Sequence, residues 1–351
     1  MSTTEIQEEK KGLSTFEKYL PIWIPLCMLA GVLLSLYTEL GSVIEASSVR
    51  GISVPIGICL FFMMYPAVLN LKGSELAKLG RNPKPILLTM VANWLVAPLV
   101  GFALAKLFLA DYPELFVAVI LLSASPCTAM VLVWGSMAQG NQEQNVVNTS
   151  LNTVSIMLFY APMVALLTGI QQIEVDRWGL AISVGVFIGL PVLLGLITRA
   201  ILIPRKGEEW FDRVYRPAFG KISIFALLTT LVVLFALNGT TILESPGHLL
   251  RVSVPLLLGF AVVVAFNLII TKLFRLKYRE AVITVIIGSS SHFEIAIATA
   301  IAAYGVGSMA ALGTTMGLFW EIPIMLGLVY LAKFLRGRGF WESGSQVDAP
   351  K

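Results

Sequence analysis

The sequence predicts an all-α protein that crosses a membrane many times. Of its 351 residues, 57% are hydrophobic and only 13% are charged, whereas soluble domains carry about 25% charged residues. The hydrophobic residues gather in runs of the length that a helix needs to cross a bilayer, about 20 residues. A soluble core helix would end sooner and would show a polar face.

Ten apolar runs are the expected membrane spans, and the short connectors between them leave no room for a second soluble domain. We expect a charged tail at 1–18, one transmembrane domain at 19–335 and a second tail at 336–351. The longest connector, 203–221, is charged and aromatic, which predicts a position at the membrane surface. The spans are expected at 20–38, 52–70, 86–109, 115–137, 147–170, 179–202, 219–238, 250–274, 281–303 and 308–333.

The basic residues predict the orientation of the chain in the plasma membrane. If the amino terminus is cytoplasmic, only Arg50, Lys106, Arg177 and Arg251 of the 25 basic residues fall on the outer side. Loops that face the cytoplasm are enriched in Lys and Arg. Both tails are therefore expected in the cytoplasm.

Two interrupted spans indicate an inverted repeat. Five spans in each half, at about 19–172 and 177–335, would insert in opposite directions. The fourth span contains "SASPCTAM" (123–130), and the ninth contains "GSSSHFEIA" (288–296). Paired breaks at corresponding positions of two repeats are the best sequence indication of a transporter's central site. The spans are therefore expected to form two inverted five-helix repeats with broken helices 4 and 9. If these two breaks cross, their half-helix ends point at one central site.

The residues of these breaks are expected to face a polar cavity. Pro126 cannot donate a backbone hydrogen bond and pushes Ser125 out of helical geometry. Freed backbone groups survive inside a membrane only where protein or water satisfies them. Thr128 and Ser291 are thus candidates for a binding site together with Ser125. The alternative is a simple proline kink whose serines bond to the preceding turn.

Glu294 is the candidate proton-coupling residue. A carboxylate inside a span costs about 3 kcal/mol to insert and normally faces the protein interior, where it carries function. His292 could meet it if the segment is not helical. Glu321, beside Pro323, is a second intramembrane acid with either a site role or a structural role.

Two asparagines and a cysteine complete the candidate site. Asn93 and Asn152 are expected either to line the cavity or to bond between helices. Cys127 lies beside the proline of the first break, and thiolates prefer soft ions such as trivalent arsenic and antimony. We interpret Cys127 as the arsenic ligand, with the metalloid as cargo. Cys27 and Cys59 are interpreted as packing residues.

Four segments resemble the arsenical-resistance arsenite permeases of the bile acid/arsenite/riboflavin transporter superfamily. These segments are "SASPCTAMVLVWGSMAQGN", "NWLVAP", "GSSSHFEIAIATAIAAYG" and "WEIPIML". The resemblance covers nearly the whole chain. It implies a panel and a core subdomain, crossed broken helices 4 and 9, export of arsenite and often antimonite in exchange for protons, an essential cysteine at Cys127 and an essential glutamate at Glu294.

The chain departs from the family pattern at three positions. Ala97, Thr153 and Ser291 stand where the family usually has lysine, aspartate and asparagine. These changes leave open the coupling ion, a proton or sodium, and the exact range of substrates.

Two other functions remain as alternatives. A sodium-coupled importer of an organic anion would bind sodium through oxygen atoms of Ser125, Thr128, Ser291 and Glu294. An intramembrane enzyme would need a nucleophile and a base, for which Cys127 and His292 are the candidates. The chain has no phosphate-binding loop or nucleophile elbow, so we expect neither an enzyme nor a cofactor. The expected partners are arsenite, a coupling ion and the lipid bilayer, without nucleic acid.

Overall fold

Helices make up most of the computed structural model, which describes residues 19–39, 43–44, 46–49, 52–69, 83–128, 130–173, 177–244, 246–305 and 307–341. The expected tail at 1–18 lies outside the described residues, as does the tail expected at 336–351 from residue 342 onward. The helices in chain order are α3 (Leu20–Tyr37), α5 (Val54–Leu69), α7 (Pro83–Val91), α8 (Ala97–Leu109), α9 (Pro113–Ser123), α10 (Met130–Met137), α11 (Gln142–Ile170), α12 (Arg177–Val184), α13 (Leu190–Lys206), α14 (Glu208–Trp210), α15 (Arg216–Glu244), α16 (Pro246–Leu273), α17 (Tyr278–Gly288), α18 (Phe293–Tyr304) and α19 (Met309–Gly337). A hairpin of β1 (Ser48–Val49) and β2 (Ile52–Ser53) precedes α5.

Three short π-helical turns join helices without interrupting them. They are η2 (Ala92–Val96), η3 (Gly185–Gly189) and η4 (Phe211–Tyr215). Each is followed, two residues later, by a proline: Pro98, Pro191 or Pro217. A proline removes one helical hydrogen bond and its ring clashes with the preceding turn, so a widened turn at this place lets the helix continue.

Six continuous helical stretches of the described chain are long and apolar enough to cross a membrane. They are Pro83–Leu109, Gln142–Ile170, Leu180–Lys206, Glu208–Leu237, Pro246–Leu273 and Met309–Gly337. Shorter apolar helices occur at Ile22–Tyr37, Val54–Met63, Pro113–Ser123 and Phe293–Tyr304. This all-helical, apolar architecture is that of a polytopic membrane protein.

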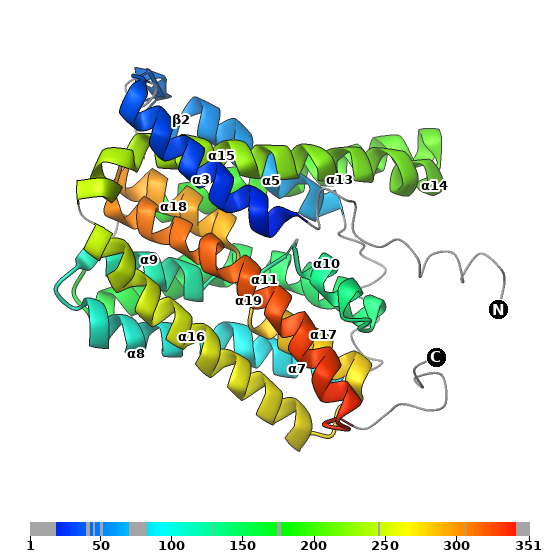
Figure 1. The fold of residues 1–351 in the computed structure, drawn as a ribbon. Helices are drawn as coiled ribbons and strands as arrows, with labels where there is room; N and C mark the ends of the chain where they lie inside the picture. Colours follow the sequence, from blue (N-terminus) through cyan, green and yellow to red (C-terminus); the bar gives the residue numbers. More distant parts are fainter. Residues whose placement is uncertain are drawn as a thin grey trace.

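The helices form two layers. In one layer, α15 packs along α3 and α5, and α13 packs on α5 (Figure 1). The other layer contains α7 to α11 and α16 to α19, with α8 between α9 and α16. At the contact of α3 and α15, a Cβ on Gly31 would lie 2.6 Å from the Val232 carbonyl oxygen and from Phe235 Cβ. Glycine is therefore required for this close approach, as is common between membrane helices.

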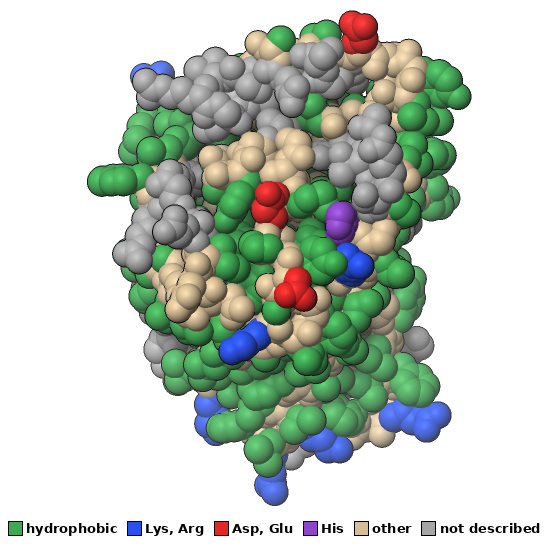
Figure 2. Space-filling view, turned by 90° about the vertical axis from the view of Figure 1, so that its left-hand side faces the viewer, with side chains coloured by type: hydrophobic (Ala, Val, Ile, Leu, Met, Phe, Trp, Pro, Cys, Tyr) green, Lys and Arg blue, Asp and Glu red, His purple; other side chains and the backbone are tan. Residues whose placement is uncertain are grey.

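Apolar side chains cover the outside of the helices. Leu95 and Leu99 are at least half exposed, and Leu258 and Val262 are exposed on α16. Figure 2 shows one end of the molecule, where hydrophobic side chains surround only a few charged groups. The exposed apolar side chains along the helices suit contact with lipid chains.

Two segments differ from the sequence-based expectation in detail. The expected connector 203–221 is helical except at Gly207, since α13 extends to Lys206 and α14 starts at Glu208. The last helix continues to Gly337, and Trp341 beyond it is buried, with its indole N–H donating to Thr271 Oγ1 at 3.2 Å. Aromatic packing thus holds residues just past the domain boundary expected at 335.

Candidate functional site

The first break separates α9 from α10 and is caused by Pro126. A helix would need a donor at position 126 for the carbonyl of Leu122, and proline has none. The Ser125 hydroxyl donates to that carbonyl instead, at 2.9 Å. Helical structure ends at Ser123 and resumes at Met130.

The second break separates α17 from α18 and contains no proline. Helical structure ends at Gly288 and resumes at Phe293. Asn267 of α16 donates to the Gly288 carbonyl at 2.9 Å and to Ser289 Oγ at 3.1 Å. Glu321 of α19 accepts hydrogen bonds from the Ser290 hydroxyl and from the backbone N–H and hydroxyl of Ser291. Neighbouring helices thus satisfy the freed polar groups, as burial in a membrane requires.

The two breaks lie against each other. Pro126 and Ser291 pair as an isolated antiparallel bridge. The His292 backbone N–H donates to the Ser125 carbonyl at 2.6 Å. Asn152 of α11 supports the first break by donating to the Cys127 carbonyl at 2.9 Å. Segments that are 165 residues apart in the chain, at 126 and 291, therefore form one crossing point.

A hydrogen-bonded chain of side chains links the crossing point to an acid. Thr128 Oγ1 lies 2.8 Å from His292 Nε2, and His292 Nδ1 lies 2.8 Å from Glu294 Oε2. Glu294 is 5% exposed and His292 3%. Because the imidazole can donate from one nitrogen and accept on the other, this arrangement can pass a proton between the carboxylate and the hydroxyl of Thr128.

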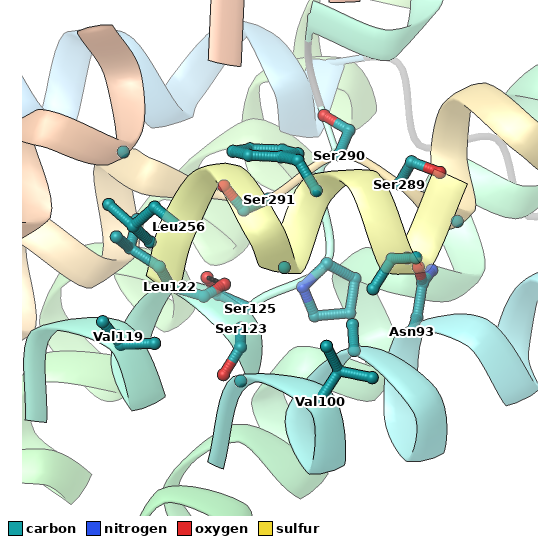
Figure 3. A pocket seen from close by; sticks show the side chains of 18 of the residues that line it. Asn93, Val100, Val119, Leu122, Ser123, Ser125, Leu256, Ser289, Ser290 and Ser291 are labelled. Atoms are coloured by element: carbon teal, nitrogen blue, oxygen red, sulfur yellow. Dashed lines mark hydrogen bonds between the residues drawn. The ribbon is translucent and has the colours of Figure 1, made fainter. Parts of the chain in front are cut away.

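A half-open cavity of about 600 Å³, a volume that includes the open space at its mouth, lies on one side of the crossing point (Figure 3). Serines of both breaks line it together with Asn93, and α8 and α16 add apolar walls that include Val100 and Phe260. Four of these serine hydroxyls donate to protein oxygens, so each oxygen keeps lone pairs that can accept a hydrogen bond or bind a cation. These serines are Ser123, Ser125, Ser290 and Ser291.

The structure divides the predicted site residues between two environments. Asn93, Ser125 and Ser291 line the cavity. The lining does not include Cys127, Thr128, His292, Glu294, Asn152 or Glu321. Cys127, 1% exposed, packs in the hydrophobic core. The thiol and Glu294 are thus close to the crossing point but separated from the cavity in this conformation.

The two asparagines and the second acid have defined partners. Asn93 Nδ2 donates to Asn152 Oδ1 at 3.1 Å, so the two amides form an interhelical pair while Asn93 also reaches the cavity. Glu321, 2% exposed, binds the second break, rather than only stabilising the bend at Pro323.

The structure shows the contacts of the three residues that depart from the family pattern. Ala97 lines the cavity, Thr153 donates to the Thr149 carbonyl of its own helix at 3.0 Å, and Ser291 binds Glu321. Among the residues that the structure describes, no three His, Cys, Asp or Glu side chains cluster as a resident metal site would require.

The sequence predicted that Ser290 lies in the second break, but it did not point to Asn267. Asn267 is fully buried and supports the second break, as Asn152 supports the first. Asn267 could have been found from the sequence, because it is an amide in the middle of an apolar run. The same feature made Asn93 a candidate.

Comparisons with known proteins connect this geometry to transporters. The model of the sodium bile acid symporter family matches residues 57–245. Arsenical-resistance protein Acr3 of Alkaliphilus metalliredigens is 31% identical, over 96% of this chain and 97% of its own length. Acr3 of Corynebacterium glutamicum is 32% identical over 95% of this chain and 93% of its own. An uncharacterized transporter of Synechocystis is 34% identical over 92% of this chain and 89% of its own.

Proposed function

Because this chain belongs to the sodium bile acid symporter family, and within it to the arsenical-resistance arsenite permeases, we propose that it exports trivalent arsenic from the cell in exchange for protons. The proposal rests above all on one observation, the chain Thr128–His292–Glu294 at the crossing of the two breaks. It joins a buried acid to the residue that follows Cys127.

Cys127 acts on the cargo in this proposal. Arsenous acid is uncharged, and its arsenic is a soft centre that prefers sulfur. The thiol replaces one hydroxyl group, so an As–S bond forms, an As–OH bond breaks and water leaves. Water reverses the exchange on the other side. A single thiol permits this release, and the same chemistry extends to antimonite.

Glu294 carries the coupled proton. It takes up a proton from outside when the site faces outward and releases it to the cytoplasm when the site faces inward. The His292 ring forms hydrogen bonds with both Glu294 and Thr128 of the first break. A change of charge at Glu294 therefore alters the hydrogen bonds that hold the two breaks together. Rocking of one helix layer against the other then exposes the site alternately.

Ten spans in two inverted repeats, at about 19–172 and 177–335, provide the framework for this motion. The equivalent hydrogen bonds at the two breaks support this arrangement. Asn152 on α11 binds the backbone of the first break, and Glu321 on α19 binds the backbone of the second. The distribution of basic residues supports a plasma-membrane protein with both termini in the cytoplasm.

The cavity favours one alternative function, sodium-coupled import of an organic anion. Its serine oxygens, with Glu321 directly behind Ser290 and Ser291, are the hard ligands that sodium prefers. Cys127 lies outside that cavity and would have no role in such a site.

Arsenite flux in everted membrane vesicles tests the proposal. We expect accumulation driven by a proton gradient, unchanged by a sodium gradient and lost in Cys127→Ser. Cys59→Ser, which removes another thiol within an apolar helix, serves as the matched control and retains transport. Flux driven by sodium, or full flux in Cys127→Ser, would contradict the proposal.

A further inference from the structure

The first half of α11 buries a row of amide side chains. Gln144, Asn148 and Asn152 follow one another at intervals of four residues and therefore lie on one face of the helix. All three are buried, as is the neighbouring Asn145. Polar side chains inside a membrane bundle are rare and generally functional.

Hydrogen bonds of the amide nitrogens fix the orientation of these side chains. Gln144 Nε2 donates to the Glu280 carbonyl at 3.2 Å. Asn148 Nδ2 donates to Thr89 Oγ1 at 3.2 Å, and that hydroxyl itself donates to the Pro85 carbonyl. Because the nitrogens face acceptors, turning either amide around would place oxygen against oxygen.

The amide oxygens are left without donors. Within the part of the chain that the structure describes, Gln144 Oε1, Asn145 Oδ1 and Asn148 Oδ1 are buried and receive no hydrogen bond. Buried acceptors of this kind in native proteins are normally satisfied by internal water. Three such oxygens within five residues of one helix indicate a shared row of water molecules.

The spacing along the helix suits such a row. Residues four apart rise about 6 Å along the axis, which is twice the length of a hydrogen bond of about 2.8 Å. The spacing thus equals two hydrogen bonds, the length that one bridging water molecule would span from Gln144 to Asn148 and from Asn148 to Asn152.

We propose that Gln144, Asn148 and Asn152 bind a chain of internal water molecules that carries protons between the crossing point and the end of the bundle at Asn141 and Arg279. This inference rests on the proposed function and supplies its proton route. At the inner end, Asn152 bonds the Cys127 carbonyl, one residue before Thr128. At the other end of the row, which the proposed topology places on the cytoplasmic side, the Asn141 N–H donates to the Arg279 carbonyl at 2.8 Å.

The path continues to the acid through residues already described. A proton leaving Glu294 passes to His292 and Thr128, and then to the first water. Each transfer along the row breaks one O–H bond and forms another, so no other reactant is consumed.

Two transport modes of the full-length protein in vesicles separate this role from a structural one. Arsenite–arsenite exchange needs the binding site but no net proton movement, whereas gradient-driven flux needs both. In Asn148→Leu and Gln144→Met, gradient-driven flux should fall about tenfold, with exchange kept within about twofold of the wild type. Thr149→Val, whose hydroxyl bonds only within its own helix, should keep both modes.

Water density in a high-resolution structure of the wild-type protein gives a second measurement that needs no variant. We expect ordered water at about 3 Å from Gln144 Oε1 and Asn148 Oδ1. A dry row, or full gradient-driven flux in both amide variants, overturns the inference. If the wild-type protein shows no arsenite exchange, the proposed function is refuted instead. The water density then still decides whether the amides bind a row of water molecules.

Discussion

His292 is the residue that ties the candidate site together. Its ring bonds both Thr128 and Glu294, and its backbone N–H bonds Ser125. Inside a low-dielectric bundle such bonds are stronger than in water, and losing one partner leaves the others unsatisfied. Both breaks and the acid are therefore connected through this one residue.

Replacing the ring by a phenyl group should uncouple the site. His292→Phe keeps an aromatic ring but neither nitrogen, so the link from Glu294 to Thr128 is lost. We expect arsenite flux driven by a proton gradient to fall by about 100-fold, the scale of a positioned proton-transfer group. His248→Phe, at a ring that packs edge-on against Tyr112, is the control and should transport normally. Equal flux in the two variants would exclude the relay.

The two buried acids should respond differently to neutralisation. Glu294→Gln is expected to abolish proton-driven flux while the protein remains folded, because among the residues that the structure describes its carboxylate hydrogen-bonds only His292. Glu321→Gln removes the charge and replaces one carboxylate oxygen, an acceptor for Ser290 or Ser291, with an amide NH2 group. It should destabilise the protein by about 1.5–3 kcal/mol for each charge-assisted bond lost. Thermal unfolding in detergent, measured beside vesicle flux, distinguishes the two effects. A Glu321→Gln protein as stable as wild type would contradict the structural role.

At the scale of the helices, small residues and broken ends determine the packing. The breaks persist because Asn152, Asn267 and Glu321 on neighbouring helices satisfy their backbone groups. Within one layer, the long contact between α3 and α15 depends instead on the absence of a side chain at Gly31.

Filling that contact should destabilise the protein. Gly31→Val forces α3 away from the Val232 carbonyl, at an expected cost of about 1–3 kcal/mol, as for other overpacked sites. Gly169→Ala is a matched control, since a Cβ there meets no atom within 4 Å. Thermal unfolding of both variants in the same detergent measures the difference. Equal melting temperatures would show that α3 and α15 tolerate separation at this point.

At the scale of the whole molecule, the two layers and the placement of charge determine how the protein sits in the membrane. The α13–α14 junction and the end of α19 lie at the same end of the molecule, on the right of Figure 1. The α8–α9 turn lies at the opposite end. The positive-inside rule predicts that the first of these ends faces the cytoplasm.

Labelling from one side of the membrane checks this orientation. A membrane-impermeant thiol reagent should modify Asp111→Cys, in the α8–α9 turn, in intact cells. Glu208→Cys, at the start of α14, should react only in everted vesicles. The parent chain, with its native cysteines, measures background labelling. The reverse pattern would invert the proposed topology.

Much of the fold could be predicted because its signals are local. The long apolar runs, the proline at 126 and the serine-rich segment at 288–292 predicted spans and breaks that the structure contains. The family resemblance, carried by the same segments, is confirmed by relatives over nearly the whole length. The roles of Cys127 and Glu294 are still predictions.

The sequence by itself determined a membrane protein with two interrupted helices, because hydrophobic run length and proline chemistry act within a few residues. Only the tertiary structure decided which polar groups meet. It paired Thr128 with His292 across 164 residues, assigned Glu321 to the second break, and separated the serine-lined cavity from Cys127. Such partners follow from how helices pack and cross, and no local pattern of residues encodes that three-dimensional arrangement.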